Sequence, residues 1–423
     1  MTNEIRTKTK DKIVPNQTKP IQQKEVSKLN KKKFLDDTDT MITTLIHSSS
    51  RCCFMAAALT TTYILSVILF PVRSVTALAS ASTTPKILLC DAPSSVLSLL
   101  RDRSCKLELR QGITDDELAS RLQEGDIDAF VIRSANTASS EWIRSTIAPQ
   151  TTSRVRVIGR AGVGLDNIDC DTCRELQIPV VTAAGANAVA VAEHALALLL
   201  ALARKIKPAT ASVAQGRWDK PDLTGVGLRG KTLGIVGFGA IGWELAKIGS
   251  ALGMSIVIAP PTKATTLSQE QEALRKTKLA SVAEDAKQAS TLQELLETAD
   301  FVSVQLPLTE TTRGYIGRSE LERMKPNARL VSVGRGGVVD EAALLDCLER
   351  NCIAGAALDV FESEGPDRIG TDEVLAKLAA LDSTVITPHV GGHTEEAQLD
   401  VWSCVVDNVL KALQTSNMES IVP

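Results

Sequence analysis

The segment Lys231–Gly242, KTLGIVGFGAIG, joins a short apolar run to three closely spaced glycines. This pattern predicts a buried strand over 232–236, then a glycine turn and a helix. In such a unit Gly237 permits the tight turn, Gly239 leaves space beside the backbone, and Gly242 lets the helix pack on the strand. The helix N-terminus offers N–H groups and a positive dipole end to phosphates. The segment therefore predicts a dinucleotide site, and an ordinary strand–helix turn is the alternative.

Apolar runs alternate with helix-like segments on both sides of this unit, which predicts an α/β fold with parallel sheets. In the N-terminal lobe we expect strands over 86–90, 128–132 and 154–159. In the C-terminal lobe we expect further strands over 254–258, 301–306, 329–333, 353–359 and 384–387. The predicted class is α/β, with two Rossmann-like, doubly wound parallel-sheet domains and a cleft between them.

The segment 188–203, AVAVAEHALALLLALA, is apolar nearly all round and predicts a buried helix at a domain or subunit interface. We interpret His194 within it as a packed or capping residue. Basic residues follow and are expected to end the helix, because cations suit its negative dipole end: Arg204, Lys205 and Lys207. The polar stretch 262–290 is interpreted in part as a surface excursion. A closing helix over 395–413 is expected to return to the first lobe.

Composition excludes several classes of function. A net charge of −3 and 3% aromatic residues leave no basic or stacking surface for nucleic acid. Nine scattered cysteines are not typical of a disulfide framework, and we interpret Cys170 and Cys173 as two side chains on one helix. We expect no metal site. Acid–base chemistry by histidine has four candidates: His47, His194, His389 and His393.

Residues 1–80 have the character of a targeting leader. A Lys-rich polar stretch precedes the uncharged run 52–72, and no Asp or Glu occurs between Met41 and Cys90. A basic flank, an apolar run and small residues at 77–79 predict cleavage near residue 80 and import into an organelle, plastid before mitochondrion. The run is also long enough to span a bilayer, so a retained membrane anchor is the alternative.

Polar residues follow several predicted strands. Ligands of open α/β sheets bind outside the carboxyl ends of the strands. Arg335, Glu364 and His389 each follow a strand of the second lobe. In the first lobe Arg133 and the glycine-rich turn 159–164 do the same, and guanidinium or backbone N–H groups there suit an anion. A surface arginine and a simple loop are the alternatives.

Residues 86–423 resemble the D-isomer-specific 2-hydroxyacid dehydrogenases. The matching blocks are IGRAGVGLDNID (158–169), AVAEHALALLLALAR (190–204), GFGAIG (237–242), ARLVSVGRGGVVDEAAL (328–344), AGAALDVFESE (354–364) and TPHVGGHT (387–394). Within the family the D-3-phosphoglycerate dehydrogenase branch is the most similar, above all in the first two blocks. The resemblance implies a substrate-binding domain, 86–184 plus 390–423, and an NAD(P)-binding domain, 185–389.

The resemblance also implies roles for single residues. His389 is the general base that takes the hydroxyl proton, Glu364 orients its ring, and Arg335 binds the substrate carboxylate and polarises the carbonyl oxygen. The implied nucleotide contacts are Gly237, Gly239, Ala240, Ile241, Gly242, Thr262, Leu306, Val333, Gly334, Asp359, His389, Gly391 and Gly392. The implied substrate contacts are Arg133, Ala161, Gly162, Val163, Gly164 and Arg335. His393 is interpreted as a residue of the surface or of the outer shell of the site.

Two departures from the family pattern bear on function. The end of the 254–258 strand, beginning at Ala259, carries no acid for the ribose hydroxyls, so both NAD and NADP remain open. Gly365 stands where the family usually has proline. The chain ends at Pro423, from which we expect no C-terminal regulatory domain.

The activity implied is oxidation of 3-phospho-D-glycerate to 3-phosphohydroxypyruvate, the entry to serine biosynthesis. NADPH-dependent reduction of glyoxylate or hydroxypyruvate is the alternative within the same chemistry. The more distant alternative is a nucleotide-sensing binding protein of the same fold. The expected partners are a small 2-hydroxy or 2-oxo acid and a second copy of the chain, bound through the 190–204 region.

Overall fold

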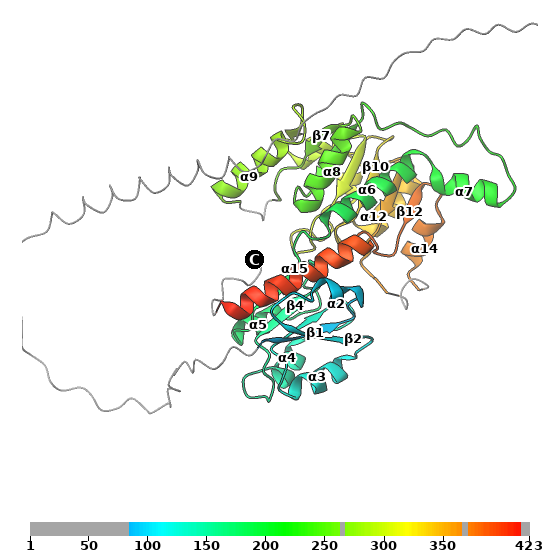
Figure 1. Cartoon of the computed structure of the whole chain (residues 1–423). Coiled ribbons are helices and arrows are strands. Elements are labelled where there is room, and N and C mark those ends of the chain that lie inside the picture. Colours follow the sequence, from blue (N-terminus) through cyan, green and yellow to red (C-terminus); the bar gives the residue numbers. More distant parts are fainter. Residues whose placement is uncertain (1–83, 263–266, 366–370, 416–423) are drawn as a thin grey trace, which may run out of the picture. The chain divides into compact units, whose positions relative to one another are not determined.

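The computed structural model describes residues 84–262, 267–365 and 371–415 (Figure 1). The predicted leader, with its apolar run, lies outside these residues. Over the described ranges, none of the helices has both the length and the apolar character that a membrane crossing requires.

The N-terminal sheet is parallel, with strand order β2-β1-β3-β4-β5. Its strands are β1 (Lys86–Cys90), β2 (Lys106–Arg110), β3 (Ala129–Ile132), β4 (Val157–Arg160) and β5 (Val180–Thr182). Its connecting helices are α2 (Ser95–Leu99), α3 (Asp115–Gln123), α4 (Ser140–Thr146) and α5 (Cys170–Glu175).

The prediction of three strands in this lobe was incomplete, because β2 and β5 were missed. Strand β2, KLELR, lies at the edge of the sheet and keeps charged side chains at alternate positions, so it has no continuous apolar run. Strand β5 has three residues, too few to show a period. The first gap follows from position at the edge of the sheet and the second from the short length of the strand.

Both faces of the first sheet are covered. Ile87 and Leu89 of β1 pack in a cluster with Trp402, which is fully buried on α15 (Glu395–Gln414). Leu88 alternates to the other face and packs with Leu118 of α3. Figure 1 shows α15, in red, beside the strands of this sheet. The expected return of the closing helix to the first lobe is therefore confirmed.

The second sheet is also parallel, with strand order β12-β11-β10-β9-β6-β7-β8. Its strands are β6 (Thr232–Val236), β7 (Ser255–Ile258), β8 (Lys287–Gln288), β9 (Phe301–Val304), β10 (Arg329–Ser332), β11 (Gly355–Leu358) and β12 (Thr384–Ile386). The chain runs outward from β6 in one direction and from β9 in the other. The order therefore reverses between these two neighbours, which is the switch point of a doubly wound sheet.

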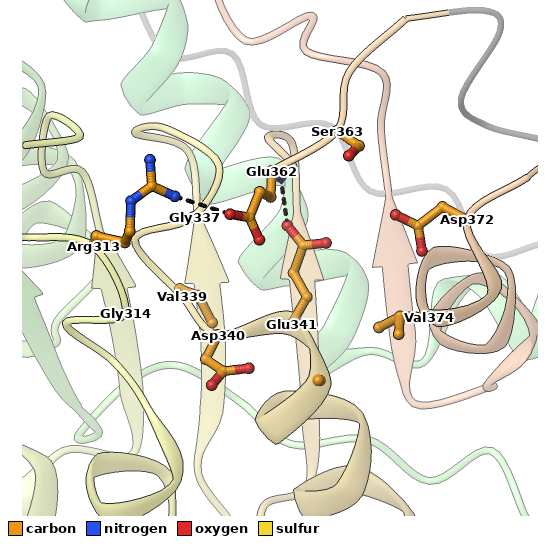
Figure 2. A pocket seen from close by; sticks show the side chains of 11 residues that line it. Arg313, Gly314, Gly337, Val339, Asp340, Glu341, Glu362, Ser363, Asp372 and Val374 are labelled. Atoms are coloured by element: carbon orange, nitrogen blue, oxygen red, sulfur yellow. Dashed lines mark hydrogen bonds and ion pairs between the residues drawn. The ribbon is translucent and has the colours of Figure 1, made fainter.

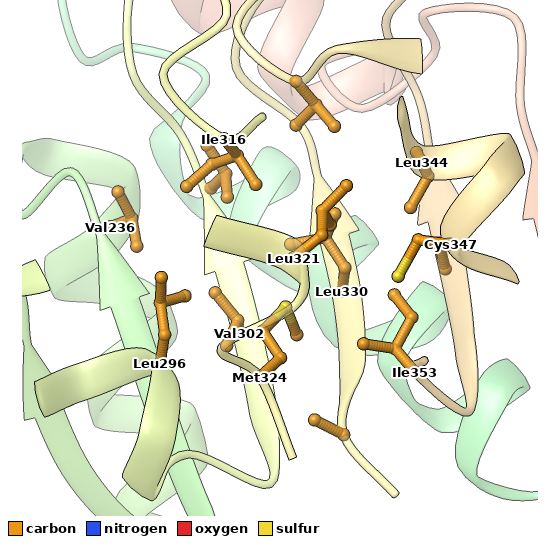
Figure 3. Packing of buried hydrophobic residues seen from close by; sticks show 14 of the residues in the cluster. Val236, Leu296, Val302, Ile316, Leu321, Met324, Leu330, Leu344, Cys347 and Ile353 are labelled. Carbon is orange, nitrogen blue, oxygen red and sulfur yellow. The ribbon is translucent and has the colours of Figure 1, made fainter. Parts of the chain in front are cut away.

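The helices of this part are α6 (Ala188–Ala203), α7 (Ile206–Ala214), α8 (Ala240–Ala251), α9 (Gln269–Ala280), α10 (Leu292–Thr298), α11 (Arg318–Leu321), α12 (Glu341–Glu349) and α14 (Glu373–Ala380). Figure 3 shows one core, where Leu296, Leu321 and Leu344 from three helices meet strand residues such as Val302 and Leu330. A second core joins α6 and α8 to the sheet through residues such as Leu199 and Leu245. On these two sheets and their cores we propose the domain division 86–184 plus 390–423 and 185–389.

Helix α6 ends at Ala203 with Arg204 as its C-cap, so the predicted end of this helix at the basic residues is confirmed. Lys205 adopts a left-handed backbone, φ 51°, and the chain continues as α7 from Ile206. The Lys207 ammonium donates to the carbonyl oxygens of Ala379 (2.7 Å) and Leu381 (2.5 Å), at the end of α14. The left-handed conformation of Lys205 therefore bends the chain between α6 and α7. The Lys207 ammonium, which was expected to interact with the dipole of α6, contacts the end of α14 instead.

The stretch 262–290, interpreted in part as a surface excursion, contains regular structure that was not predicted. The stretch contains α9, which starts with a capping box between Ser268 and Gln271, and β8, whose Lys287 pairs with Val257 of β7. In α9 only Leu279 is buried, so the helix shows little amphipathic period. Strand β8 forms the last strand of the seven-stranded sheet beside β7.

An ion cluster fixes the edge strand β2. The Arg121 guanidinium, 8% exposed, lies 2.6 Å from Glu108 and 2.6 Å from Asp126, and the Lys86 ammonium lies 2.8 Å from Glu108. Hydrogen bonding from Arg121 is the main cause that lowers the pKa of Glu108 to about 2. Because this pKa is depressed on folding, the carboxylate contributes stability above its ordinary pKa, which is lost as pH falls toward 2.

We predict that Glu108→Gln lowers the free energy of unfolding by about 2 kcal/mol at pH 7, because Arg121 keeps only part of its counter-charge. Urea denaturation followed by circular dichroism measures this. The difference from the wild type should shrink as pH falls from 4.5 toward 2. Glu124→Gln is the control, since that 64%-exposed carboxylate pairs with the same guanidinium at 3.2 Å and should cost under about 0.5 kcal/mol. Equal losses in both variants would contradict the assignment.

Candidate active site

Three polar residues follow adjacent strands of the second sheet. Arg335 follows β10, Glu364 follows β11 and His389 follows β12. These strands pair in parallel, with Ser332 opposite Leu358 and Leu358 opposite Ile386, so their carboxyl ends lie side by side. The sheet therefore gathers residues that lie up to 54 positions apart in the sequence, 389 minus 335.

His389 and Glu364 form a direct pair. His389 Nδ1 lies 2.7 Å from Glu364 Oε2, and the two side chains are 43% and 37% exposed. An ionised carboxylate only accepts hydrogen bonds, so Nδ1 carries the proton in this contact. The neutral ring then keeps its lone pair on Nε2, which is the atom free to act as a base.

The Glu364 carboxylate is held in its charged form. Burial is the largest single influence and would raise its pKa. The hydrogen bond and charge of His389, the Phe361 N–H at 3.2 Å and the charge of Arg335 together outweigh burial, so the pKa lies below the ordinary value. Glu364 is therefore a carboxylate that can orient and stabilise a charged imidazole.

Arg335 meets the glycine-rich turn that follows β4. Its Nε lies 3.5 Å from Asp166 Oδ2, and its Nη1 donates to the carbonyl of Gly334 at 2.9 Å. A Cβ on Gly164 would overlap the Arg335 guanidinium, so the two loops approach closely. Ala161 is buried in the same turn, whereas the Val163 side chain is 45% exposed. Gly162, with φ 154°, completes the turn.

Arg160 belongs to this group, and the sequence reasoning missed it. Burial is the main cause that lowers its pKa, followed by the positive charges of Arg335 and Arg133. Its Nη1 donates to the carbonyl of Ala161 at 2.9 Å, and within the described part of the chain no hydrogen-bond partner reaches its buried Nε. The signal was an arginine inside a strand-to-glycine turn, IGRAG, of which only the turn was considered.

Arg133 and His393 lie at the rim of the same group. The Arg133 Nη2 atom lies 3.4 Å from His393 Nε2. This contact joins the turn after β3 to the loop after β12. His393 was predicted to lie at the surface or in the outer shell of the site. In the structure it contacts Arg133, which was predicted to bind the substrate.

Buried Asp359 holds the loop that carries His389. Its carboxylate, 2% exposed, accepts from the N–H groups of Val390 (3.0 Å) and Gly391 (2.8 Å) and from the Thr387 hydroxyl (2.5 Å). His194 Nε2 lies 3.2 Å from the same carboxylate. Burial would raise the pKa of Asp359, but these hydrogen bonds outweigh it and lower the pKa.

The hydrogen bonds of Asp359 stabilise an unfavourable backbone conformation at His389. His389 has φ 54°, a left-handed conformation that costs a non-glycine residue about 1 kcal/mol or more. The two N–H groups that Asp359 accepts come directly after His389, so they pin the loop in that conformation. His194, interpreted above as packed or capping, is a hydrogen-bonding member of the network. Asp359, assigned above to the nucleotide, has its carboxylate engaged by protein groups.

The glycine turn after β6 fits a dinucleotide. Gly237 has φ 101°, and a Cβ on Gly242 would clash with the Gly237 carbonyl. A Cβ on Gly239 would meet open space, and this residue precedes α8 without a side-chain cap. The N-terminal N–H groups of α8, which begins with Ala240 and Ile241, are therefore left for phosphates.

The remaining predicted nucleotide contacts lie at the same edge of the second sheet. They follow β7, β9, β10 and β12 as Thr262, Leu306, Val333, Gly334, Gly391 and Gly392. Gly365, after Glu364, has φ 121°, which a proline ring cannot adopt. The departure from the family pattern at this position therefore matches the local backbone.

Comparison with known proteins places this geometry in a family. Residues 196–391 match the D-isomer specific 2-hydroxyacid dehydrogenase, NAD binding domain. The hydroxypyruvate reductase of Thermotoga maritima is 39% identical over 298 residues, which are 70% of this chain and 88% of that protein. The TT0316 protein of Thermus thermophilus has a solved structure with a TM-score of 0.62 and 30% identity, covering 78% of this chain and 97% of that one.

Longer relatives match over part of their length. The D-3-phosphoglycerate dehydrogenase of Archaeoglobus fulgidus is 35% identical over 345 residues, 80% of this chain and 60% of that protein. D-3-phosphoglycerate dehydrogenase 2, chloroplastic, of Arabidopsis thaliana is 34% identical over 338 residues, 78% of this chain and 49% of that protein. This chain thus spans about half to three fifths of their length. The strand-end residues, the glycine turn and the matched domain agree, and the chain belongs to the D-isomer-specific 2-hydroxyacid dehydrogenase family.

Proposed function

We propose that the protein is an NAD(P)-dependent dehydrogenase that oxidises a D-2-hydroxy acid at C2. The observation that carries the proposal is the His389–Glu364 pair, at 2.7 Å, with the charge of Arg335 close enough to lower the pKa of Glu364. An oriented base and a fixed cation are what the oxidation of a hydroxy acid requires.

Each side chain has a step in this chemistry. A bound nicotinamide supplies the hydride acceptor. His389 Nε2 takes the hydroxyl proton as the C2 hydrogen leaves as hydride, and Glu364 stabilises the imidazolium that results. Arg335 binds the substrate carboxylate and stabilises negative charge on the C2 oxygen, a contribution worth about 3 kcal/mol when one such donor is removed. In the reverse direction the protonated His389 returns the proton.

The substrate we favour carries two anionic groups. The positive charges of Arg335 and Arg133 both act on Arg160, and Asp166 pairs with Arg335 at 3.5 Å while its own side chain is 71% exposed. Like charges at close range are costly, and an anionic ligand relieves that cost. One carboxylate on Arg335 and one phosphate near Arg160 would account for all three arginines, which supports 3-phospho-D-glycerate.

A single-anion substrate remains the alternative. The hydroxypyruvate reductase of Thermotoga maritima matches over 88% of its length and supports hydroxypyruvate or glyoxylate. A nucleotide-binding protein without turnover is the more distant candidate, and the His389–Glu364 pair has no role in it.

The nucleotide is NAD or NADP. The matched family domain supports NAD. After β7, however, Ala259 stands where an acid would exclude a 2′-phosphate. The Arg275 guanidinium of α9 donates to the Ala259 carbonyl and lies 5.5 Å from the Phe238 ring centroid, which places a cation at this strand end.

A matrix of four acids against two nucleotides tests the function: 3-phosphoglycerate, D-glycerate, hydroxypyruvate and glyoxylate, each with the oxidised or reduced NAD and NADP forms. We expect the highest kcat/KM with 3-phosphoglycerate. His389→Asn should lower kcat roughly 10²- to 10⁴-fold, the usual contribution of a general base. Good turnover of glyoxylate without activity on 3-phosphoglycerate would remove the first candidate.

Arg160→Met refines the same assay. It should raise KM for 3-phosphoglycerate at least about tenfold and leave D-glycerate little changed, because a charge-assisted bond to phosphate is lost. Arg156→Met is the matched control, since this arginine, 56% exposed, pairs with Asp128 away from the group. Equal effects on both acids would argue against a phosphate near Arg160.

We also propose a homodimer built through the 190–204 region. Val189 and Leu200 of α6 are 53% and 38% exposed, and the apolar exposure continues at Ile206, Val213 and Trp218. Several exposed apolar side chains along one stretch of chain favour a protein interface. Light scattering at micromolar concentration should give twice the mass of the chain, and a monomer would contradict the proposal.

For localisation we propose import into an organelle, plastid first and mitochondrion second, with cleavage near residue 80. The Lys-rich start of the leader, the absence of Asp and Glu between Met41 and Cys90, and the similarity to a relative named chloroplastic support it. Residues 1–80 fused to a fluorescent protein should direct it into plastids. A fusion that stays uncleaved in a membrane would favour the anchor, and one that stays in the cytosol would contradict import.

A further inference from the structure

The segment Phe361–Glu364 carries the carboxylate that pairs with His389. Side chains outside the active site contact Glu362 of this segment (Figure 2). The Glu362 N–H donates to Glu341 Oε1 at 2.7 Å. The Glu362 carboxylate in turn lies 2.9 Å from Arg313 Nη1. We call these two contacts the Glu341–Glu362–Arg313 latch. They act two residues before the catalytic carboxylate.

The latch also lies beside the Arg335 loop. A Cβ on Gly336 would overlap the Phe361 carbonyl, so the loop after β10 and the segment after β11 touch backbone to backbone. A shift of the segment would therefore displace Glu364 and disturb the neighbour of Arg335. The position of this segment therefore affects two groups of the proposed mechanism, Glu364 and Arg335.

Apolar packing holds only the start of the segment, because Phe361 is buried in the core cluster whereas Glu362 and Ser363 face open space. A cavity of about 350 Å³ lies there, lined by residues that include Arg313, Glu341, Glu362, Ser363 and Asp372. Figure 2 shows the two contacts of the latch as dashed lines along this cavity. Because open space borders Glu362 and Ser363, we expect the polar contacts of the latch to position this part of the segment.

Glu341 is a costly residue to place there. It is the first residue of α12, after the N-cap Asp340, and it is half-buried. Burial is the main cause that raises its pKa, and the carboxylates of Asp372, Glu362 and Asp340 add to it, while the Glu362 N–H opposes them. A half-buried acid near three others needs a compensating role. Holding the backbone of the segment supplies one.

We propose that Glu341 and Arg313 are positioning residues, which fix Phe361–Glu364 so that the Glu364 carboxylate meets His389 Nδ1. The kinetic part of this inference rests on the proposed dehydrogenase function, and the structural part does not. The test therefore includes a measurement that needs no turnover.

That measurement is the tautomer of His389, read from ring ¹⁵N chemical shifts of the full chain labelled at histidine. The chain has four histidines, so His389→Gln assigns the signal. In alkaline solution the wild type should show the Nδ1–H form, because Glu364 accepts from Nδ1. Glu341→Ala and Arg313→Met should shift the ring toward the Nε2–H form. Glu341→Gln, which keeps an acceptor for the Glu362 N–H, should retain the wild-type tautomer.

Kinetics supply the second readout. Glu341→Ala should lower kcat about 10- to 100-fold with little change in the KM for nucleotide, because misplacement by about 1 Å costs this much. It should also change the pH profile of kcat/KM, which a uniform loss of folded protein would not. Glu341→Gln should stay within about twofold of the wild type. Glu349→Ala is the matched control, an exposed carboxylate at the other end of α12.

The outcomes separate the two proposals. A wild type without turnover whose His389 tautomer shifts in Glu341→Ala refutes the proposed function and supports positioning. An unchanged tautomer in both Glu341→Ala and Arg313→Met refutes positioning, whatever the activity. A kcat loss of the same size in Glu341→Gln as in Glu341→Ala would refute the role of the acceptor oxygen.

Discussion

The parallel pairing of β10, β11 and β12 is the constraint on which the proposed site depends. It aligns Ser332, Leu358 and Ile386, so the residues that follow these strands emerge at one edge. The hydrogen bond between His389 Nδ1 and Glu364 Oε2 is a consequence of that register. A slip by one residue would turn every side chain of a strand to the opposite face and separate the pair. The cores on both sides of the sheet oppose such a slip.

Several features of this edge are unfavourable alone and stable together. His389 has a left-handed backbone, Glu364 is a carboxylate whose pKa burial alone would raise, and Arg160 lies near two other arginines. Asp359 offsets the first by accepting two backbone N–H groups, and hydrogen bonds to His389 and Phe361 offset the second. The arginines keep an excess of positive charge that a bound anion would neutralise. Strained backbone conformations and perturbed pKa values of this kind concentrate at the sites where a protein binds ligands and catalyses reactions.

Much of the fold could be predicted because local sequence reports burial on both faces of a strand. Strands β1, β3 and β6 are continuous apolar runs and were predicted, as was the glycine turn before Ala240. Strand β2 and helix α9 were not, since each presents charged residues to solvent at the margin of its sheet. Of the site, the three strand-end residues were predicted from spacing and from resemblance. Arg160 was not, because its meaning depends on two other arginines from distant segments.

The sequence by itself determined the α/β class, the dinucleotide turn and the identity of the three strand-end residues, because each is written in a short contiguous stretch. Only the tertiary structure decided which distant groups meet. It brought Asp359 and His194 to the His389 loop, Glu341 and Arg313 to the Glu364 segment, and Asp166 to Arg335. Such contacts depend on strand order and sheet register, which are set by the packing of the whole core and leave no local pattern.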